Sequence, residues 1–391
     1  MFLKKTFAAV VAAYIFLSPF TASAKFFDKS YRDYPTVDAP FSREKIPKPS
    51  TPSQPSIPVT PPQEGEGLEF LMYNQNGIMA FALIAAHENY KVQPIIANNR
   101  IQGRATLSQM TAPINDIAMI NGGYFEPNGN LIGITKVDGM IVGTEYIKRS
   151  AVGFNADGTV IFGQIYYHGV INLNGNDIEV GGVNCERTAN SVVIYNERFG
   201  TSTNTNNYGI EIVVKNGVIT KISRGKGNNY IPSNGYVISA HTGAAGYFAN
   251  AQIGDTVDFY ERINDDNGVF NNAVNILGAG PRLVANGRIY VTADEERFPS
   301  DIRVGRAPRS AFGVTKYGDY IFAVVDGRQS HSRGCTLYEW ADILLNHFGA
   351  VDAINLDGGG SSELVVRDRV VNSPSDGKER PVASALMIIP K

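Results

Sequence analysis

The stretch Asn355-Leu356-Asp357-Gly358-Gly359-Gly360-Ser361-Ser362 lies between two short apolar segments. Residues 349–354 before it and residues 363–366 after it are each predicted to form a buried strand. Three consecutive glycines are costly to order, because glycine loses more backbone entropy on folding than any other residue. Such a loop usually persists where the backbone must approach a ligand closely or take a positive φ. Asp357 adds a carboxylate at the start of this loop, and two serine hydroxyls follow the last glycine.

A second glycine loop, Ile120-Asn121-Gly122-Gly123-Tyr124-Phe125, also follows an apolar strand. Two glycine loops with Asn or Asp at their edges suggest one polar pocket lined by backbone N–H groups. The alternative is a pair of tight turns that bind no ligand. The pocket interpretation assigns ligand contacts to Gly122, Gly123, Gly358, Gly359, Gly360, Ser361 and Ser362.

Most of the remaining chain has the pattern of a β protein. Short β-branched and aromatic runs alternate with Asn-Gly and Asp-Gly turns, which is typical of hairpins. The clearest hairpin is predicted between residues 210–214 and 218–222. Thr336 and Glu339 have the spacing of a capping box, and apolar residues then recur at helical spacing. We therefore predict a β-rich α+β fold of mixed sheets with few helices, one of them an amphipathic helix before the Asn355–Ser362 loop.

The N-terminus has the features of a secretory signal. Lys4-Lys5 precedes the apolar run Thr6–Phe20, which is followed by the small residues Ala22-Ser23-Ala24. The apolar run is shorter than the roughly 20 residues that a membrane-spanning helix needs. We predict a signal peptide over residues 1–24, cleavage after Ala24, and a secreted or periplasmic protein with no transmembrane segment after cleavage.

The composition changes after the signal. Residues 25–67 are rich in proline and poor in large apolar side chains, so they are predicted to form a disordered linker. Residues 68–391 are long enough to bury a large core and are predicted to form one domain. The net charge of -2, from 35 basic and 37 acidic residues, argues against nucleic-acid binding.

The candidate chemical groups are carboxylates and arginines. The five histidines show no zinc-ligand spacing. Asp326-Gly327-Arg328 follows the predicted strand 320–325, which places a carboxylate and a guanidinium at one rim of a sheet. Arginine matches phosphate oxygens in pairs, so Arg309 and Arg328 are candidate phosphate ligands. The alternative for each arginine is a surface ion pair that contributes little. A nucleophilic serine is disfavoured, because the triple-glycine loop runs into a strand rather than a helix.

Seven motifs occur in an order that resembles the phosphodiester glycosidase family. They are Ile120–Phe125, Asn184-x-x-Arg187, Gly278-Ala279-Gly280-Pro281, Ala307-Pro308-Arg309, Val325-Asp326-Gly327-Arg328, Gly334-Cys335-Thr336-Leu337 and Asn355–Ser362. The resemblance covers about Phe70 to Pro390. It implies hydrolysis of a sugar-1-phosphodiester between the anomeric carbon and the phosphate oxygen, which releases free sugar and a phosphomonoester. Bacterial members of the family are often described as exopolysaccharide-related.

The resemblance also implies roles for individual residues. Asp357 and Asp326 would stabilise an oxocarbenium-like centre or activate water, and Asn121 and Asn184 would orient the sugar or that water. The phosphate would be bound by Arg309, Arg328, Arg187 and the glycine-loop amides.

The expected partner is a sugar-phosphate or cell-envelope glycan substrate. No cofactor is predicted. No metal is assigned. Asp and Asn side chains and carbonyl groups supply the oxygen ligands that calcium prefers, but the spacing of a calcium-binding loop is not visible. The alternative function is a non-catalytic protein that binds a polysaccharide or sugar phosphate in envelope or exopolysaccharide assembly.

The chain has two cysteines, Cys185 and Cys335. An exported protein folds in an oxidising compartment, so a disulfide between them is predicted. The bridge would place Arg187 beside the Asp326-Gly327-Arg328 rim. The alternative is two buried thiols.

Overall fold

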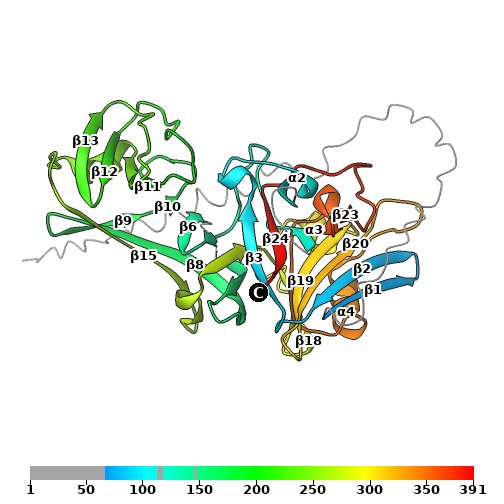
Figure 1. Ribbon diagram of the computed structural model, residues 1–391. Coiled ribbons are helices and arrows are strands. Elements are labelled where there is room, and N and C mark those ends of the chain that lie inside the picture. The colour runs from blue at the N-terminus through cyan, green and yellow to red at the C-terminus, as the bar shows by residue number, and fades with distance from the viewer. Residues whose placement is uncertain (1–66, 112–117, 145–147) are drawn as a thin grey trace, which may run out of the picture. The chain divides into compact units, whose positions relative to one another are not determined.

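The computed structural model describes residues 67–111, 118–144 and 148–391. The predicted signal peptide and residues 25–66 of the predicted linker lie outside the described residues. Strands predominate and the helices are few and short, which confirms the β-rich α+β class (Figure 1). Within the described residues, no helix has the length and apolar character that crossing a membrane would require.

Two sheets carry the residues of the candidate site. The first has seven strands in the order β1 (Leu68–Gln75), β2 (Ile78–Ala85), β20 (Tyr320–Val325), β19 (Arg309–Thr315), β21 (Ala350–Asn355), β17 (Arg282–Ala285) and β18 (Arg288–Ile289). The second has five strands in the order β23 (Arg369–Val370), β22 (Leu364–Val366), β4 (Ala118–Asn121), β24 (Ser384–Pro390) and β3 (Tyr90–Ile96). Strands β3 and β24 run side by side and antiparallel, although they come from opposite ends of the described chain (Figure 1).

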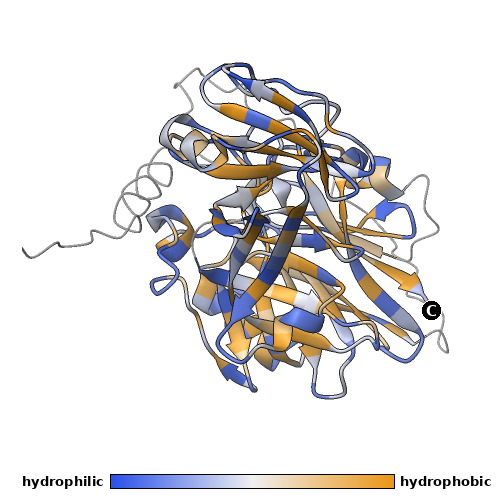
Figure 2. Ribbon diagram, turned by 90° about the vertical axis from the view of Figure 1, so that its left-hand side faces the viewer, coloured by the Kyte–Doolittle hydropathy of each residue, from blue (hydrophilic) through white to orange (hydrophobic). Residues whose placement is uncertain are grey.

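These two sheets pack face to face. Leu83 and Phe322 of the first sheet share one buried cluster with Ile120 and Leu386 of the second. The opposite face of the first sheet is covered by α4 (Leu337–Asn346), whose buried Trp340 packs among the small residues of β2, β20 and β21. The result is a layered arrangement with one helix outside a pair of sheets. Figure 2 shows that hydrophobic residues concentrate on the strands, whereas the connecting loops are mainly hydrophilic.

The other two sheets form a second packed pair. One contains β15 (Val257–Asp265), β8 (Val160–Leu173), β7 (Arg149–Phe154), β16 (Asn275–Gly278), β5 (Thr135–Val137) and β6 (Met140–Gly143), with β9 (Asn176–Val180) pairing with β8. The other contains β10 (Gly182–Val183), β11 (Val192–Tyr195), β14 (Gly235–Ala240), β12 (Ile210–Lys215) and β13 (Val218–Arg224). Their apolar faces share one cluster, which includes Ile171, Ile212 and Ile238. The remaining short helices are η1 (Ala97–Asn99), α2 (Leu107–Thr111), η2 (Thr242–Phe248), η3 (Val269–Asn272), α3 (Ser300–Val304) and η4 (Gly359–Ser361).

The locally encoded elements are confirmed. Strands β12 and β13 form the predicted hairpin, with a register irregularity at Val213/Val214. Helix α4 begins at the predicted capping box, in which the Thr336 side chain accepts from the Glu339 N–H and Glu339 accepts from the Thr336 N–H. The triple-glycine loop lies between β21 and β22, so it carries the chain from the first sheet to the second.

The predicted Cys185–Cys335 disulfide is wrong for this structure. Among the described residues, neither cysteine forms a disulfide bond. Cys335 is fully buried beside α4. Cys185 packs instead against Val193 and Tyr195, which belong to the sheet that contains β11. The two side chains therefore lie in separate hydrophobic clusters, and an oxidising compartment alone does not bring two cysteines together.

Gly123 packs so closely against a neighbouring strand that it has no room for a side chain. A Cβ atom at Gly123 would lie 2.2 Å from the carbonyl oxygen of Gly278. We expect Gly123→Ala to destabilise the protein by about 2–4 kcal/mol, because a backbone atom must move. Urea unfolding should show a lower midpoint. The matched control is Gly246→Ala, where no atom lies within 4 Å of the added Cβ. Equal midpoints for Gly123→Ala and wild type would contradict this packing.

Candidate active site

The two glycine loops predicted from the sequence do meet. Asn121 ends β4 and is fully buried. Its Nδ2 donates to the backbone oxygen of Asp357 at 2.7 Å, and the Asp357 N–H donates to the backbone oxygen of Gly122 at 3.0 Å. The Oδ1 of Asn121 accepts from Ser310 Oγ at 2.6 Å and from the Glu363 N–H at 3.2 Å. Asn121 therefore positions the loop, and these protein contacts occupy both polar atoms of its side chain.

The glycines of the two loops mainly allow close packing of the backbone, rather than forming a binding site for a ligand. The Gly122 N–H donates to Ser384, and the Gly359 N–H donates to Pro308. A Cβ atom at Gly358 would lie 3.0 Å from the Pro308 carbonyl oxygen, and one at Gly360 would collide with the Arg380–Asp376 ion pair. Gly359 adopts a φ of 63°. The glycines thus allow the loop to pass between two neighbouring segments.

Asp357 is the carboxylate at the centre of this loop, and it is 8 % exposed. Its Oδ1 accepts from the Gly358 N–H at 2.9 Å. Burial raises the pKa of Asp357 to about 6, against the opposing effects of Ser361, the Gly358 N–H and the Arg380 charge. The negative charge of Asp357 also contributes to a raised pKa of the buried Tyr124 hydroxyl, after burial itself. This hydroxyl donates to the Gly280 carbonyl at 2.9 Å and accepts from Asn355 at 3.0 Å.

Arg309 supplies positive charge beside the loop. Its side chain is 3 % exposed, and its Cδ would lie 3.8 Å from a Cβ atom added at Gly358. Nε and Nη2 donate to three carbonyl oxygens, those of Cys335, Ile302 and Gly305. Within the described residues it forms no ion pair with a carboxylate. Burial lowers the pKa of Arg309, and the positive charge of Arg328 acts in the same direction. A buried guanidinium without a carboxylate partner favours an anionic ligand.

Asp326 and Arg328 directly follow the end of β20. Arg328 is exposed and adopts a φ of 58°. Asp326 is 2 % exposed, and burial raises its pKa. Its Oδ2 lies 3.0 Å from His331 Nε2, while its Oδ1 accepts from Asn372 Nδ2 at 3.2 Å and from the Ser373 N–H at 2.8 Å. Asp326 thus orients a histidine, a role that the sequence did not indicate.

Asn372 connects Asp326 to the triple-glycine loop. Its Nδ2 also donates to the backbone oxygen of Ser362 at 3.1 Å. Among the described residues, the buried Ser362 hydroxyl has no hydrogen-bond partner. The segment 372–380 therefore lies against both predicted motifs, and Asn372, Glu379 and Arg380 were missed from the sequence. The only signal was local: Pro374, Asp376 and Gly377 mark an irregular polar loop between strands, and such loops often carry function.

Glu363 is a second buried carboxyl beside the loop. It is 2 % exposed, and neither of its carboxylate oxygens has a hydrogen-bond donor among the described residues. Burial, followed by the adjacent carboxyl of Glu379, raises the pKa of Glu363 to about 8. The Ser108 hydroxyl donates to Glu379. Glu363 is thus a buried carboxyl with a second carboxyl close to it.

Asn184 and Arg187 are not brought to this site. Asn184 donates to Val142 O and to Asn196 Oδ1. Arg187 donates to Ser239 Oγ at 3.0 Å and to Asn206 Oδ1 at 2.5 Å. These partners place both residues with the β11–β14 sheet and its loops, where Arg187 is the nearby cation for the buried Glu211. Their predicted substrate contacts are thus not supported by the geometry.

The chain matches one protein-family model over part of its length. Residues 208–389, which include Arg309, Asp326 and Asp357, match the model of the phosphodiester glycosidase family. The predicted resemblance to the phosphodiester glycosidases is confirmed. The matched range is shorter than the predicted range Phe70–Pro390, and it leaves out Asn121, Asn184 and Arg187.

Two curated relatives are similar to this protein over part of the chain. The N-acetylglucosamine-1-phosphodiester alpha-N-acetylglucosaminidase of Bos taurus is 31% identical over 182 residues, which is 42% of this chain and 33% of the relative. The SPbeta prophage-derived protein YomE of Bacillus subtilis is 39% identical over 89 residues, which is 23% of this chain and 14% of the relative. The chain therefore spans a third or less of either relative.

Two crystal structures share the fold over most of this chain. A hypothetical protein from Synechocystis has a TM-score of 0.73 at 25% identity and covers 83% of this chain and 62% of its own. An exported protein from Burkholderia pseudomallei has a TM-score of 0.68 at 23% identity and covers 80% of this chain and 74% of its own. The similarity to these structures extends well beyond residues 208–389.

Within the described residues, no group of three or more His, Cys, Asp or Glu side chains is arranged to hold a metal ion.

Proposed function

We propose that this protein is an exported hydrolase that cleaves the glycosidic bond of a sugar-1-phosphodiester. The observation that carries the proposal is that the buried Asp357 carboxyl and the buried Arg309 guanidinium both lie close enough to Tyr124 to act on its pKa, while Arg309 pairs with no carboxylate within the described residues. The family match to phosphodiester glycosidases and the activity in the name of the bovine relative point to the same bond. Secretion or delivery to the periplasm is part of the proposal and rests on the signal-like sequence of residues 1–24.

The proposed reaction adds water across the bond between the anomeric carbon and the bridging oxygen. The hydroxyl ends on the sugar, and the proton ends on the released phosphomonoester. Arg309 and Arg328 stabilise the charge that grows on the leaving phosphate. Asp357, as the carboxylate, stabilises the oxocarbenium-like carbon or attacks it. A phosphate leaving group needs little protonation, because its conjugate acid is already strong.

The position of bond cleavage tests this proposal. The full-length exported protein is incubated with several sugar-1-phosphodiesters, including teichoic-acid-like polymers and nucleotide sugars, in ¹⁸O-labelled water. We expect reducing sugar to appear with the label on the sugar and none on the phosphomonoester. Label on the phosphate would show a phosphodiesterase instead. Saturable binding without any turnover would support the alternative, a sugar-phosphate-binding protein of envelope or exopolysaccharide assembly.

A further inference from the structure

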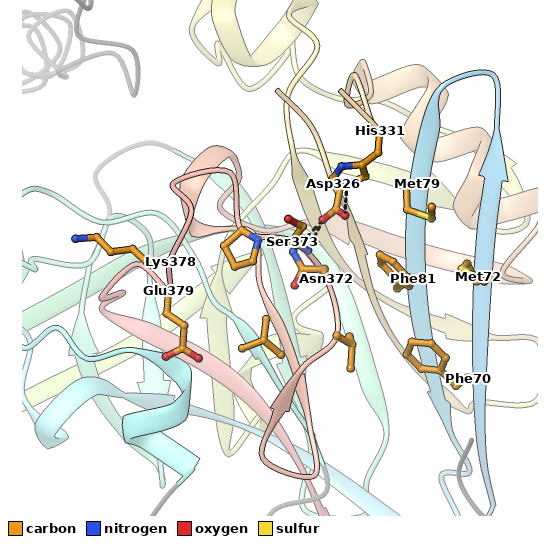
Figure 3. Close-up of a pocket in the computed structure, with 13 residues that line it drawn as sticks. Phe70, Met72, Met79, Phe81, Asp326, His331, Asn372, Ser373, Lys378 and Glu379 are labelled. Carbon is orange, nitrogen blue, oxygen red and sulfur yellow. Dashed lines mark hydrogen bonds and ion pairs between the residues drawn. The ribbon is translucent and has the colours of Figure 1, made fainter. Parts of the chain in front are cut away.

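A cavity of about 710 Å³ lies beside the candidate site, and its walls are mostly apolar. One wall is the β1–β2 hairpin, which contributes Phe70, Met72, Met79 and Phe81 (Figure 3). The opposite wall is the segment from Val370 to Glu379. The volume is within the roughly 300–1,000 Å³ that is usual for small-molecule sites. A sugar phosphate alone is largely polar and would leave much of this apolar wall uncovered.

Four polar residues of this cavity form one cluster, and Lys378 and Glu379 lie apart from it. Asp326, His331, Asn372 and Ser373 all line the cavity, and hydrogen bonds connect them (Figure 3). Asn372 also donates to the backbone oxygen of Ser362. The cavity therefore shares Asp326 and Asn372 with the candidate site. Its polar and apolar parts suit an amphipathic ligand whose polar end lies toward the loop.

The apolar wall is exposed and adaptable. Met72 is 64% exposed, although large apolar side chains are normally covered. Methionine side chains are unbranched and flexible, so they pack against irregular apolar partners. Phe70 and Phe81 stack on each other with ring centroids 6.2 Å apart, which leaves a continuous apolar surface along the hairpin. Such a surface accommodates a flexible hydrocarbon chain better than a sugar.

We propose that this cavity binds an alkyl or isoprenoid chain that is esterified to the phosphate of the substrate. The inference rests on the proposed function, and it narrows the substrate class to sugar-1-phosphodiesters with a lipid-like second alcohol. The sugar and phosphate would lie at Asp357 and the two arginines. The chain would extend past Asp326 and Asn372 along the β1–β2 hairpin.

A series of sugar-1-phosphate esters with methyl, butyl, octyl and dodecyl groups tests the inference. We expect KM to fall about threefold to fourfold for each added methylene until the cavity is filled, with little change in kcat. Met72→Ser should flatten this dependence and leave hydrolysis of the methyl ester unchanged. Ile253→Ser is the matched control, because Ile253 is 69% exposed but does not line the cavity.

The outcomes separate this inference from the proposed function. If all esters are hydrolysed with equal KM, the inference is wrong and the proposed function stands. If no ester is hydrolysed, calorimetry with methyl phosphate and octyl phosphate decides the inference: octyl phosphate must bind more tightly, and Met72→Ser must remove the difference. If chain length has no effect and Met72→Ser instead dissociates a dimer in sedimentation, the hairpin face is an interface between two copies of this chain.

Discussion

Replacement of Asp357 with asparagine is expected to lower kcat by about 100- to 10,000-fold, with little change in KM. The carboxylate acts on charge that develops only in the transition state, so substrate binding should be preserved. The Gly358 N–H donates to Oδ1, and an asparagine oxygen can accept that hydrogen bond. The variant should therefore fold with the loop intact. Initial rates on one sugar-1-phosphodiester give kcat and KM.

The same substitution is expected to stabilise the protein at about pH 8. Burial raises the pKa of Asp357 to about 6 from its usual value near 4. A raised pKa means that the folded state holds the proton more tightly than the unfolded state does. Its contribution to stability is complete at low pH and is lost as the pH rises through about 6. Asparagine avoids that loss, which is worth up to about 3 kcal/mol.

The pH dependence of turnover gives a further check. If the carboxylate is the active form, kcat for the wild-type protein should rise as the pH increases through about 6. Asp352→Asn is the control in the preceding strand: Asp352 pairs with Arg282 at 2.5 Å, so its loss should reduce stability and leave kcat unchanged. If folded Asp357→Asn keeps wild-type turnover, Asp357 is not catalytic. The role would then pass to the pair of Asp326 and His331.

The parts of the site that the sequence predicted are those encoded by adjacent residues. The capping box of α4, the buried strand β21 and the glycine loop follow one another within about 30 residues, so local propensity determines them together. The end of β20 likewise places Asp326 and Arg328 at one rim because a strand delivers consecutive residues to the same edge. Asn121 was also predicted from its place directly after an apolar strand. In the structure its side chain positions the Asp357 loop through hydrogen bonds.

The parts that were missed depend on contacts between distant segments. The spacing Asn184-x-x-Arg187 does not indicate which sheet the two residues contact. In the structure they contact the β11–β14 sheet and its loops, through Asn196, Asn206 and Ser239. The disulfide was predicted from the expected oxidising compartment alone, and a compartment gives no information about the distance between two cysteines. No sequence pattern predicts that Glu363 and Glu379 lie close together. Their contact forms only when segment 372–380 packs against the loop.

The second prediction with a large expected effect concerns Glu363 and the free energy of unfolding. Burial and the adjacent Glu379 raise its pKa to about 8, so at neutral pH the folded protein retains a proton that the unfolded chain would release. This contribution to stability is complete below about pH 4 and is lost as the pH rises toward 8. Glu363→Gln should therefore match the wild type near pH 4.5 and exceed its stability at pH 8 by up to about 4 kcal/mol.

Urea unfolding at several pH values measures this difference between Glu363→Gln and the wild type. The comparison isolates Glu363, because Asp357 and Glu261, whose pKa values burial also raises, are present in both proteins. Glu379→Gln should flatten the same pH dependence, since its amide can donate to Glu363 and favour the ionised form. Glu88→Gln is the control, because Glu88 is exposed and distant in sequence from the pair. Parallel curves for the wild type and Glu363→Gln would show that the folded protein does not hold a proton on Glu363.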